Sequence, residues 1–257
     1  MSDGGIATIY LHGQPGSADE LALFGPHIAR NSSDWHVLDR NPAAAGVGGH
    51  YGLLAMRARR FAAGRPIRLI GFSLGGWTAL HLAAQMGEEI SSIDLIASAA
   101  QPRGGIYPPE MVGKPVFELA RDHPSLFAGL TRAQGLGAMV APALVRSALF
   151  AKAQGGDGAL AQQPAFRQGI TRILRASLSG DAAAYRRDMA EFVSGSPPDL
   201  AAITAPVTLW HGEADNWAPI ALVEQLAPRL PRLAAFHRLP GLSHYSALHH
   251  ALATMDA

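Results

Sequence analysis

Short apolar runs alternate with stretches of helical spacing along the first hundred residues of the chain. The apolar runs are typical of buried strands, and apolar residues spaced three to four apart are typical of helices that pack on one face. Predicted strands lie at 6–11, 35–38, 67–72 and 93–97, and predicted helices lie at 51–63 and 74–86. This alternation predicts an α/β fold with a parallel sheet covered on both faces. Such sheets bind their ligands at the carboxyl ends of the strands.

The alternation stops between Arg103 and Asp199, a stretch rich in Ala, Leu, Arg, Gly and Pro. Its apolar positions have helical spacing, and no part of it is typical of a strand. The alternation then resumes, with predicted strands at 206–210 and 233–239 and predicted helices at 220–226 and from about Ser246. We therefore expect a core made of residues 1–102 and 200–257, with a helical insertion at 103–199.

The composition is that of a folded and nearly neutral protein. Of the 257 residues, 48% are apolar and 16% are charged, which provides for a sizeable core. The chain has 21 Lys and Arg against 20 Asp and Glu, so its net charge is +1. So small a charge provides no strong field to attract nucleic acid or acidic lipid, and we expect neither as a partner.

The sequence lacks cysteine and lacks the patterns of membrane-spanning and secretory segments. The chain contains no Cys, which excludes disulfides, thiolate metal sites and thiol nucleophiles. No run approaches the roughly eighteen consecutive apolar residues of a membrane-spanning helix, and residues 1–5 lack the basic flank and apolar core of a secretory signal. We expect a cytoplasmic protein whose covalent chemistry uses oxygen or nitrogen.

The strongest local motif lies between a predicted strand and a predicted helix. Residues 71–76 read Gly-Phe-Ser-Leu-Gly-Gly, which places Ser73 on a tight strand-to-helix turn. Glycines are needed beside such a turn because larger residues would collide there. The turn would leave the Ser73 hydroxyl exposed at the edge of the sheet, where it is a candidate nucleophile.

A serine hydroxyl is a poor nucleophile at neutral pH and needs a base, most often a His that a carboxylate orients. His244 lies in a turn after the last predicted strand, which would put its ring above the carboxyl edge of the sheet. In contrast, His81, His249 and His250 lie within predicted helices. His244 is therefore the candidate base.

The candidate carboxylate is Asp215, whose loop directly follows an apolar strand and would lie at the same edge of the sheet. Glu213 is its nearest competitor in that loop. Asp94 lies within a predicted strand, which is a poorer place for a residue that must reach a loop histidine.

Together these residues resemble the α/β-hydrolase fold superfamily, whose nucleophile, acid and base occur along the chain in the order of Ser73, Asp215 and His244. The loop that reads Leu-His-Gly-Gln-Pro-Gly at 11–16 is similar to the His-Gly-x-Pro-Gly loop of that family. The resemblance implies that the backbone N–H groups of Leu74 and Gln14 form an oxyanion hole.

The resemblance also has consequences for the rest of the chain. It implies that 103–199 is a helical cap that lies over the site and shapes the substrate pocket. Only five residues precede the first predicted strand, so the chain resembles an N-terminally shortened member of the family. The missing strands would expose a sheet edge, which a second copy of the chain could cover in a homo-oligomer.

The implied reaction is hydrolysis of a small carboxylic ester or lactone through an acyl-enzyme, with no metal and no organic cofactor. Because the nucleophile position holds Ser and not Asp, the alkyl-transfer branches of the family do not fit. Two alternatives stay open: a C–C bond hydrolase that acts on a diketone with the same three residues, and a receptor on this fold that binds its ligand without turnover.

The only indication of the substrate comes from apolar residues that could line its pocket. Trp77 and Trp217 lie close to the motifs and are the better candidates for lining the pocket. Seven more apolar residues of 103–199 could face it: Met111, Phe117, Phe127, Met139, Phe150, Phe166 and Phe192. This set favours a substrate with a largely apolar acyl side.

Overall fold

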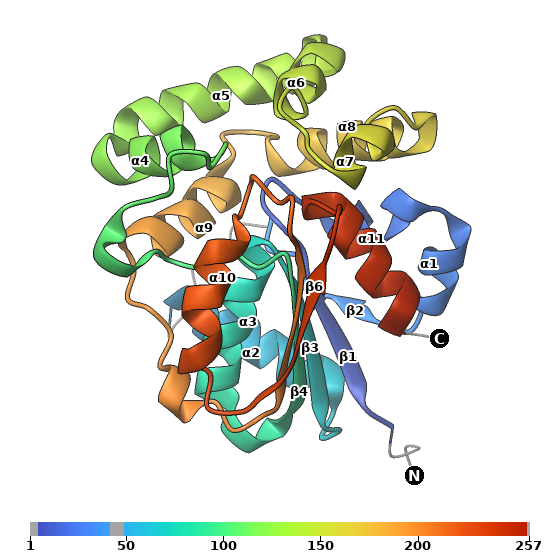
Figure 1. Cartoon of the computed structure of the whole chain (residues 1–257), viewed down its shortest axis with the longest axis vertical. Coiled ribbons are helices and arrows are strands. Elements are labelled where there is room, and N and C mark those ends of the chain that lie inside the picture. The colour runs from blue at the N-terminus through green and yellow to red at the C-terminus, as the bar shows by residue number, and fades with distance from the viewer. Residues whose placement is uncertain (1–4, 42–48, 256–257) are drawn as a thin grey trace.

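A computed structural model describes residues 5–41 and 49–255 of the chain and contains a sheet of six parallel strands (Figure 1). The strand order across the sheet is β2-β1-β3-β4-β5-β6. The strands are β1 (Ala7–Leu11), β2 (His36–Val37), β3 (Ile67–Phe72), β4 (Ile90–Ile96), β5 (Val207–Gly212) and β6 (Leu233–Leu239). The predicted α/β fold with a parallel sheet is confirmed.

Helices cover both faces of the sheet, as Figure 1 shows, with α2, α3 and α10 on one side and α1 and α11 on the other. Their bounds are α1 (Pro26–Asn31), α2 (Gly49–Ala62), α3 (Leu74–Met86), α10 (Ile220–Leu226) and α11 (His244–Met255). The central strands are buried on both faces, which explains why β3 reads as a nearly continuous apolar run.

The register of β1 against β3 places two loops side by side. Leu11 at the end of β1 pairs with Gly71 near the end of β3, and both strands run in the same direction. The loop after β1 and the turn after β3 therefore leave the sheet at the same edge. This register is what brings residues 12–16 next to Ser73.

The chain between β4 and β5 forms six α-helices and no strand in the described part of 103–199. They are α4 (Lys114–Asp122), α5 (Pro124–Val140), α6 (Pro142–Leu149), α7 (Gly156–Leu160), α8 (Pro164–Ser177) and α9 (Ala183–Ser194). Figure 1 shows α4 to α8 above the end of the sheet from which the site loops leave, with α9 lower beside it. We refer to residues 103–199 as the helical segment.

Two helix starts depend on more than the spacing of their residues. Ser17 and Glu20 have the spacing of a reciprocal helix cap, and Ser17 does accept a hydrogen bond from the Asp19 N–H, at 3.2 Å. Glu20 instead points into the core, where it accepts from the Tyr10 hydroxyl at 2.8 Å. The last helix begins at His244, two residues before the predicted start.

The edge of the sheet beside β1 is partly covered. The two residues of β2 pair with Ile9 and Tyr10 only, so β1 has one neighbour over the rest of its length. The oligomeric state stays a prediction. Within the described ranges, none of the helices combines the length and the apolarity needed to cross a membrane.

Candidate active site

The turn between β3 and α3 is as tight as the glycine pattern predicts. Ser73 has φ +53° and ψ −124°, a conformation outside the regions that residues with side chains normally adopt. A Cβ on Gly75 would lie 2.0 Å from the carbonyl oxygen of Leu11, and a Cβ on Gly71 would lie 2.6 Å from the Cα of Gly76. Only glycine fits both positions, because Gly75 packs on the end of β1 and Gly71 packs on the start of α3.

Backbone hydrogen bonds hold this strained turn against β4. The Ser73 N–H donates to the Ile96 carbonyl at 3.1 Å, and the Ala99 N–H donates to the Ser73 carbonyl at 3.0 Å. Ser73 is half-buried and lines a cavity between the sheet edge and the helical segment. Its neighbour Leu74 is the first residue of α3, where a helix leaves its N–H groups without a partner in the helix.

Asp215 and His244 form a short hydrogen bond, with 2.7 Å between Oδ2 and Nδ1. The other carboxylate oxygen of Asp215 accepts the N–H groups of Trp217 and Ala218, each at 2.9 Å. Both members of the pair are buried, whereas Glu213 is exposed. The loop after β5 thus fixes Asp215 from one side while the imidazole occupies its other oxygen.

Burial and charge act in opposite directions on this pair. Burial alone would lower the pKa of His244, but the Asp215 carboxylate outweighs it, and the pKa of His244 is raised above its usual value. Burial alone would raise the pKa of Asp215, but His244 and the N–H donors hold that pKa below its usual value. Asp215 is therefore ionised at neutral pH, and Nδ1 of His244 donates the hydrogen bond.

His211 on β5 packs beside the pair without sharing its role. Its Nε2 lies 2.7 Å from the carbonyl oxygen of Ala218 and 3.6 Å from Oδ2 of Asp215. Burial lowers the pKa of His211, in spite of the nearby Asp215 carboxylate. A neutral His211 can donate to the Ala218 carbonyl and so hold the loop that carries Asp215.

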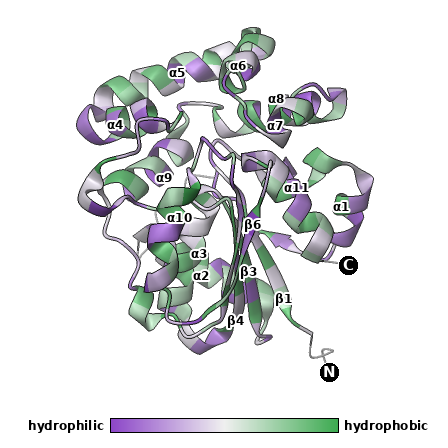
Figure 2. Ribbon diagram, in the orientation of Figure 1, coloured by the Kyte–Doolittle hydropathy of each residue, from purple (hydrophilic) through white to green (hydrophobic). Residues whose placement is uncertain are grey.

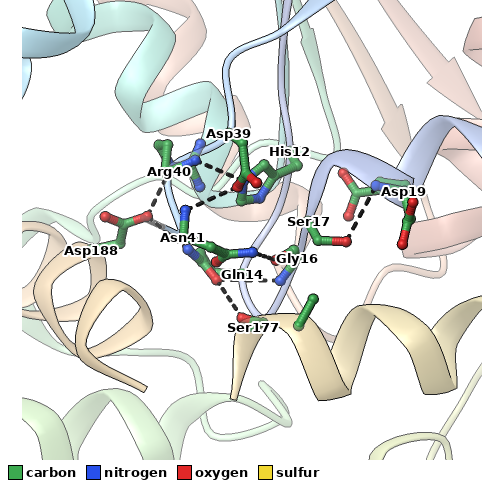
Figure 3. A network of polar contacts seen from close by, with 12 residues as sticks. His12, Gln14, Gly16, Ser17, Asp19, Asp39, Arg40, Asn41, Ser177 and Asp188 are labelled. Atoms are coloured by element: carbon green, nitrogen blue, oxygen red, sulfur yellow. Dashed lines mark hydrogen bonds and ion pairs between the residues drawn. The ribbon is translucent and has the colours of Figure 1, made fainter. Parts of the chain in front are cut away.

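Gln14 anchors the loop after β1 to the helical segment, as Figure 3 shows. Its side-chain amide donates to Oδ2 of Asp188 at 2.9 Å and accepts from the Ser177 hydroxyl at 2.9 Å. The Gly13 N–H donates to Glu20 at 2.9 Å. Within 5–41 and 49–255, the backbone N–H groups of Gln14 and Leu74 donate no hydrogen bond.

A cavity of about 380 Å³ connects these groups. Ser73, His244, Gln14 and Leu74 line it together with Trp217. Much of the remaining lining comes from apolar residues of the helical segment, among them Met111, Phe117, Leu149, Leu174, Met189 and Phe192. No Asp, Glu, Lys or Arg belongs to its lining. The cavity is thus apolar, with polar groups concentrated near Ser73.

The structure brings most of the predicted site residues together, but it separates Trp77 from them. Trp77 is not part of the cavity lining because its indole packs edge-on against Phe192, with 5.1 Å between the ring centroids. Of the other apolar residues named from the sequence, Phe127, Met139, Phe150 and Phe166 also lie outside the lining.

The serine and the imidazole face the same cavity without a direct bond. Among the hydrogen bonds of the described residues, none joins Ser73 to His244. The ring of Phe72, next to Ser73, lies 4.7 Å from the imidazole of His244 between centroids. In enzymes without substrate, such a hydrogen bond is often long and shortens only when substrate binds.

Two buried groups near the site have no signal in the sequence pattern. Arg40 and Asp188 form a buried ion pair, with 2.8 Å between Nε and Oδ2, although 148 residues separate them along the chain. Asp157 contacts the start of α11. A charged residue in a helix is ordinarily taken as solvated, and only the folded chain shows these as buried.

Within the described residues, no group of three or more His, Cys, Asp or Glu side chains could hold a metal ion.

Comparison with known families identifies the fold independently. A profile of the alpha/beta hydrolase fold family matches residues 59–251, from α2 to α11. The chain belongs to the α/β-hydrolase fold family. Comparison with curated protein sequences gives no match.

Solved structures of this α/β-hydrolase fold are similar over nearly the whole chain. An esterase from Exiguobacterium antarcticum is 17% identical with a TM-score of 0.65, covering 98% of this chain and 91% of that one. A thermophilic esterase from Thermogutta terrifontis is 16% identical with a TM-score of 0.65, covering 98% and 88%. MenH from S. aureus is 15% identical with a TM-score of 0.57, covering 99% and 95%. Identities this low establish the shared fold alone.

Proposed function

We propose that this α/β hydrolase is a serine hydrolase that cleaves a carboxylic ester or lactone through an acyl-enzyme. The observation that carries the proposal is the buried Asp215–His244 pair, which meets Ser73 in one cavity. Ser73 stands on a turn whose strain and glycine packing expose a nucleophile. The unbonded N–H groups of Gln14 and Leu74 line the same cavity.

The proposed cycle uses only groups of this chain and water. Nε2 of His244 takes the proton of the Ser73 hydroxyl as its oxygen attacks the carbonyl carbon. The N–H groups of Leu74 and Gln14 hold the negative charge that develops on the carbonyl oxygen. Asp215 keeps the proton on Nδ1 and stabilises the imidazolium. The intermediate then expels the alcohol, which takes the proton from His244, and water hydrolyses the acyl-serine with His244 as base.

The proposed substrate is neutral and largely apolar. A charged group would lose its hydration in a cavity whose lining offers no Asp, Glu, Lys or Arg. The helical segment acts as the cap of this site because its residues supply much of the apolar lining. Two polar side chains of the cap, Gln134 and Tyr185, also reach the lining and could orient a polar substituent.

The names of the similar structures agree with this proposal in part. Two are called esterases and one is MenH. The fold supports several reactions, so the assignment to esters rests on the site and not on the resemblance.

The test compares Ser73→Ala with wild type on a series of p-nitrophenyl esters from acetate to decanoate. We expect hydrolysis to fall by roughly four or more powers of ten, because the nucleophile is lost while the oxyanion donors remain. Ser91→Ala is the matched control, since Ser91 lies on β4 and donates to the Ile67 carbonyl away from the cavity. Full activity of Ser73→Ala would end the assignment.

A fluorophosphonate label separates the two alternatives. Labelling of Ser73 with turnover of esters supports the proposal. Labelling without turnover of any ester or lactone would favour a ligand-binding receptor. Faster turnover of a vinylogous diketone than of any ester would favour a C–C bond hydrolase.

A further inference from the structure

Asp157 of the helical segment reaches the first turn of the helix that carries His244. Its Oδ1 accepts the N–H and the hydroxyl of Ser246, each at 2.7 Å, and its Oδ2 accepts the Tyr245 N–H at 3.0 Å. Asp157 lies on α7 and is fully buried. A carboxylate from a different part of the chain therefore holds the start of α11.

These hydrogen bonds replace the cap that the sequence next to the helix does not provide. The first N–H groups of a helix have no partner within it, and a negative charge there is stabilised by the helix dipole. Ser243 directly precedes α11, yet its hydroxyl makes no hydrogen bond among the described residues. Asp157 thus does the work that an N-cap serine normally does.

The backbone around Asp157 is also fixed against the His244 loop. The Gly156 N–H donates to the Gly241 carbonyl at 3.0 Å. A Cβ on Gly155 would lie 2.5 Å from the same carbonyl oxygen. The start of α7 therefore lies directly against the loop, and a shift of α7 would break the hydrogen bond from Gly156 to Gly241.

The hydrogen bonds around Asp157 suit an ionised carboxylate. Both of its oxygens accept hydrogen bonds, from two N–H groups and from the Ser246 hydroxyl, which itself accepts the Ser243 N–H at 2.7 Å. The two N–H groups can only donate, so they favour the charged carboxylate. Burial raises the pKa of Asp157, and the donors on α11 together with His244 oppose that rise.

We propose that Asp157 is a positioning residue for the base: its hydrogen bonds to the first turn of α11 fix the His244 ring against the cavity. The inference rests on the proposed function, in which His244 takes the Ser73 proton. The titratable groups around the ring are Asp215 after β5, His211 on β5, Glu20 in the 3₁₀ helix Ala18–Phe24, Asp157 on α7 and the adjacent Tyr245. Two carboxylates do most to raise the pKa of His244: Asp215 has the larger effect and Asp157 the next.

The test is Asp157→Asn, which keeps the shape and one acceptor oxygen but removes the charge. We expect kcat to fall about tenfold with KM changed by less than about threefold, because the base and not the cavity is affected. The acid limb of kcat/KM should also move to lower pH, since His244 loses a neighbouring negative charge. Asp199→Asn is the matched control, because Asp199 caps an exposed 3₁₀ turn through the Ala201 N–H at 3.1 Å.

Two results would overturn the inference. The first is an acid limb that stays at the wild-type pH in folded Asp157→Asn. The second is a titration of His244, followed by NMR of its imidazole, that does not change in this variant. The NMR measurement needs no turnover, so it tests Asp157 even if Ser73→Ala retains activity and the proposed function fails.

A second, independent observation concerns the outer surface of the helical segment. Residues 124–180 contain six Lys and Arg and one acidic residue, the buried Asp157, whereas the rest of the chain has fifteen basic and nineteen acidic residues. The net charge of +1 therefore hides a strongly uneven distribution. The outer face of α5, α6 and α8 is basic, while the remainder of the protein is acidic.

Exposed aliphatic side chains occupy the same face. Leu136, Met139, Val140 and Leu144, at the junction of α5 and α6, are exposed by 62–73%. Figure 2 shows hydrophobic residues along α5, on the part of the molecule far from the sheet. Large exposed aliphatic residues that gather in one place mark an interaction surface.

Arginines adjoin this aliphatic patch. Arg146, Arg167, Arg172 and Arg175 line one groove between α6 and α8. Arg175 donates to the Ala138 carbonyl at 3.1 Å, which ties the groove to the end of α5. The aliphatic and cationic groups thus form one continuous surface, which we call the basic apolar face.

We infer that the basic apolar face docks on a lipid bilayer with acidic headgroups. A second copy of the chain is the poorer occupant, because a symmetric pairing would bring two sets of arginines together with no exposed acid among 124–180. An anionic bilayer suits both the aliphatic and the cationic side chains of this face. Leu and Met can enter its hydrocarbon region, and Arg can pair with its negatively charged headgroups. The inner faces of α5, α6 and α8 line the cavity, so docking would place its cover against the membrane.

Sedimentation with vesicles tests this inference without any measure of hydrolysis. We expect binding to phosphatidylglycerol vesicles that weakens at least about tenfold in Arg167→Glu/Arg172→Glu and in Val140→Asp/Leu144→Asp. Arg60→Glu and Met56→Asp on α2 are the matched controls, as both residues are exposed and lie away from this face. Three results would each overturn the inference. The wild-type protein could bind phosphatidylcholine vesicles as well as phosphatidylglycerol vesicles, or bind neither. It could also form a dimer that dissociates in Val140→Asp/Leu144→Asp.

Discussion

Removing Asp188 should destabilise the protein far more than removing an exposed partner of an arginine. Asp188 accepts from Nε of Arg40 at 2.8 Å and from the Gln14 amide at 2.9 Å (Figure 3). Nη2 of Arg187 also lies 2.9 Å from Oδ1 of Asp188. The Arg40 side chain is fully buried, and its Nη1 makes no hydrogen bond among the described residues. Asp188→Ala would therefore leave a buried guanidinium without its counter-charge.

The expected magnitude follows from burial. Breaking a buried ion pair from one side costs about 3–5 kcal/mol, because the remaining charge stays desolvated. A protein of this size loses about 2–4 °C in Tm for each kcal/mol, so the expected drop is roughly 6–20 °C. Glu89→Ala is the matched control: Glu89 pairs with Arg59 on the surface, where both side chains are more than two-fifths exposed. That pair should contribute about 1 kcal/mol or less.

Thermal unfolding at neutral pH measures both variants. A third variant, Arg40→Met/Asp188→Leu, should recover at least half of the loss, since an apolar pair of similar volume avoids the buried charge. In Asp188→Ala, kcat should also fall, because Gln14 loses one of the contacts that hold its loop. Equal Tm shifts for Asp188→Ala and Glu89→Ala would refute the reasoning.

Three further predictions concern the site itself. Asp215→Asn should lower kcat by about 10³–10⁴, while Glu213→Gln stays near wild type because Glu213 is exposed; the reverse order would show that the wrong acid was chosen. Activity should fall on acidification through a pH above the 6.5 of a free imidazole, because the pKa of His244 is raised and only the neutral ring accepts the Ser73 proton; an acid limb well below 6.5 contradicts this. Ser73→Gly should be inactive but about 1 kcal/mol more stable than Ser73→Ala in thermal unfolding, because glycine relieves the positive φ; equal stability would mean that the turn is not strained.

The sequence predicted those parts of the site that depend on short stretches of chain. The turn at Ser73 was predictable because its strain and close packing demand glycines at fixed spacing. The helix Ile220–Leu226 and the strand Leu233–Leu239 match their predicted bounds because their apolar patterns are clear. Asp215 and His244 were predictable as pair members because both follow strands that end at one edge of the sheet.

The parts that were not predictable depend on contacts between distant segments. Glu20 has the spacing of a helix cap, but the Tyr10 hydroxyl and the Gly13 N–H draw it into the core. Trp77 lies one turn after Ser73, yet Phe192 of the helical segment stands between it and the cavity. No local pattern encodes either outcome, since each partner belongs to another element of the fold.

Three of the segments that carry proposed catalytic groups are bound to the helical segment. Asn216, next to the acid, accepts from the Val112 N–H and donates to the Lys152 carbonyl, both at 2.8 Å. Asp157 holds the helix that begins with the base, and Asp188 holds the oxyanion loop through Gln14.

A cap that served only to enclose substrate would need none of these three attachments. Because all three exist, a movement of the helical segment large enough to open the cavity would also disturb the proposed acid, the proposed base and the proposed oxyanion loop. In the proposed function, the segment would therefore fix the geometry of the site as well as enclose it, because the same packing produces the apolar lining and the alignment of the proposed catalytic groups.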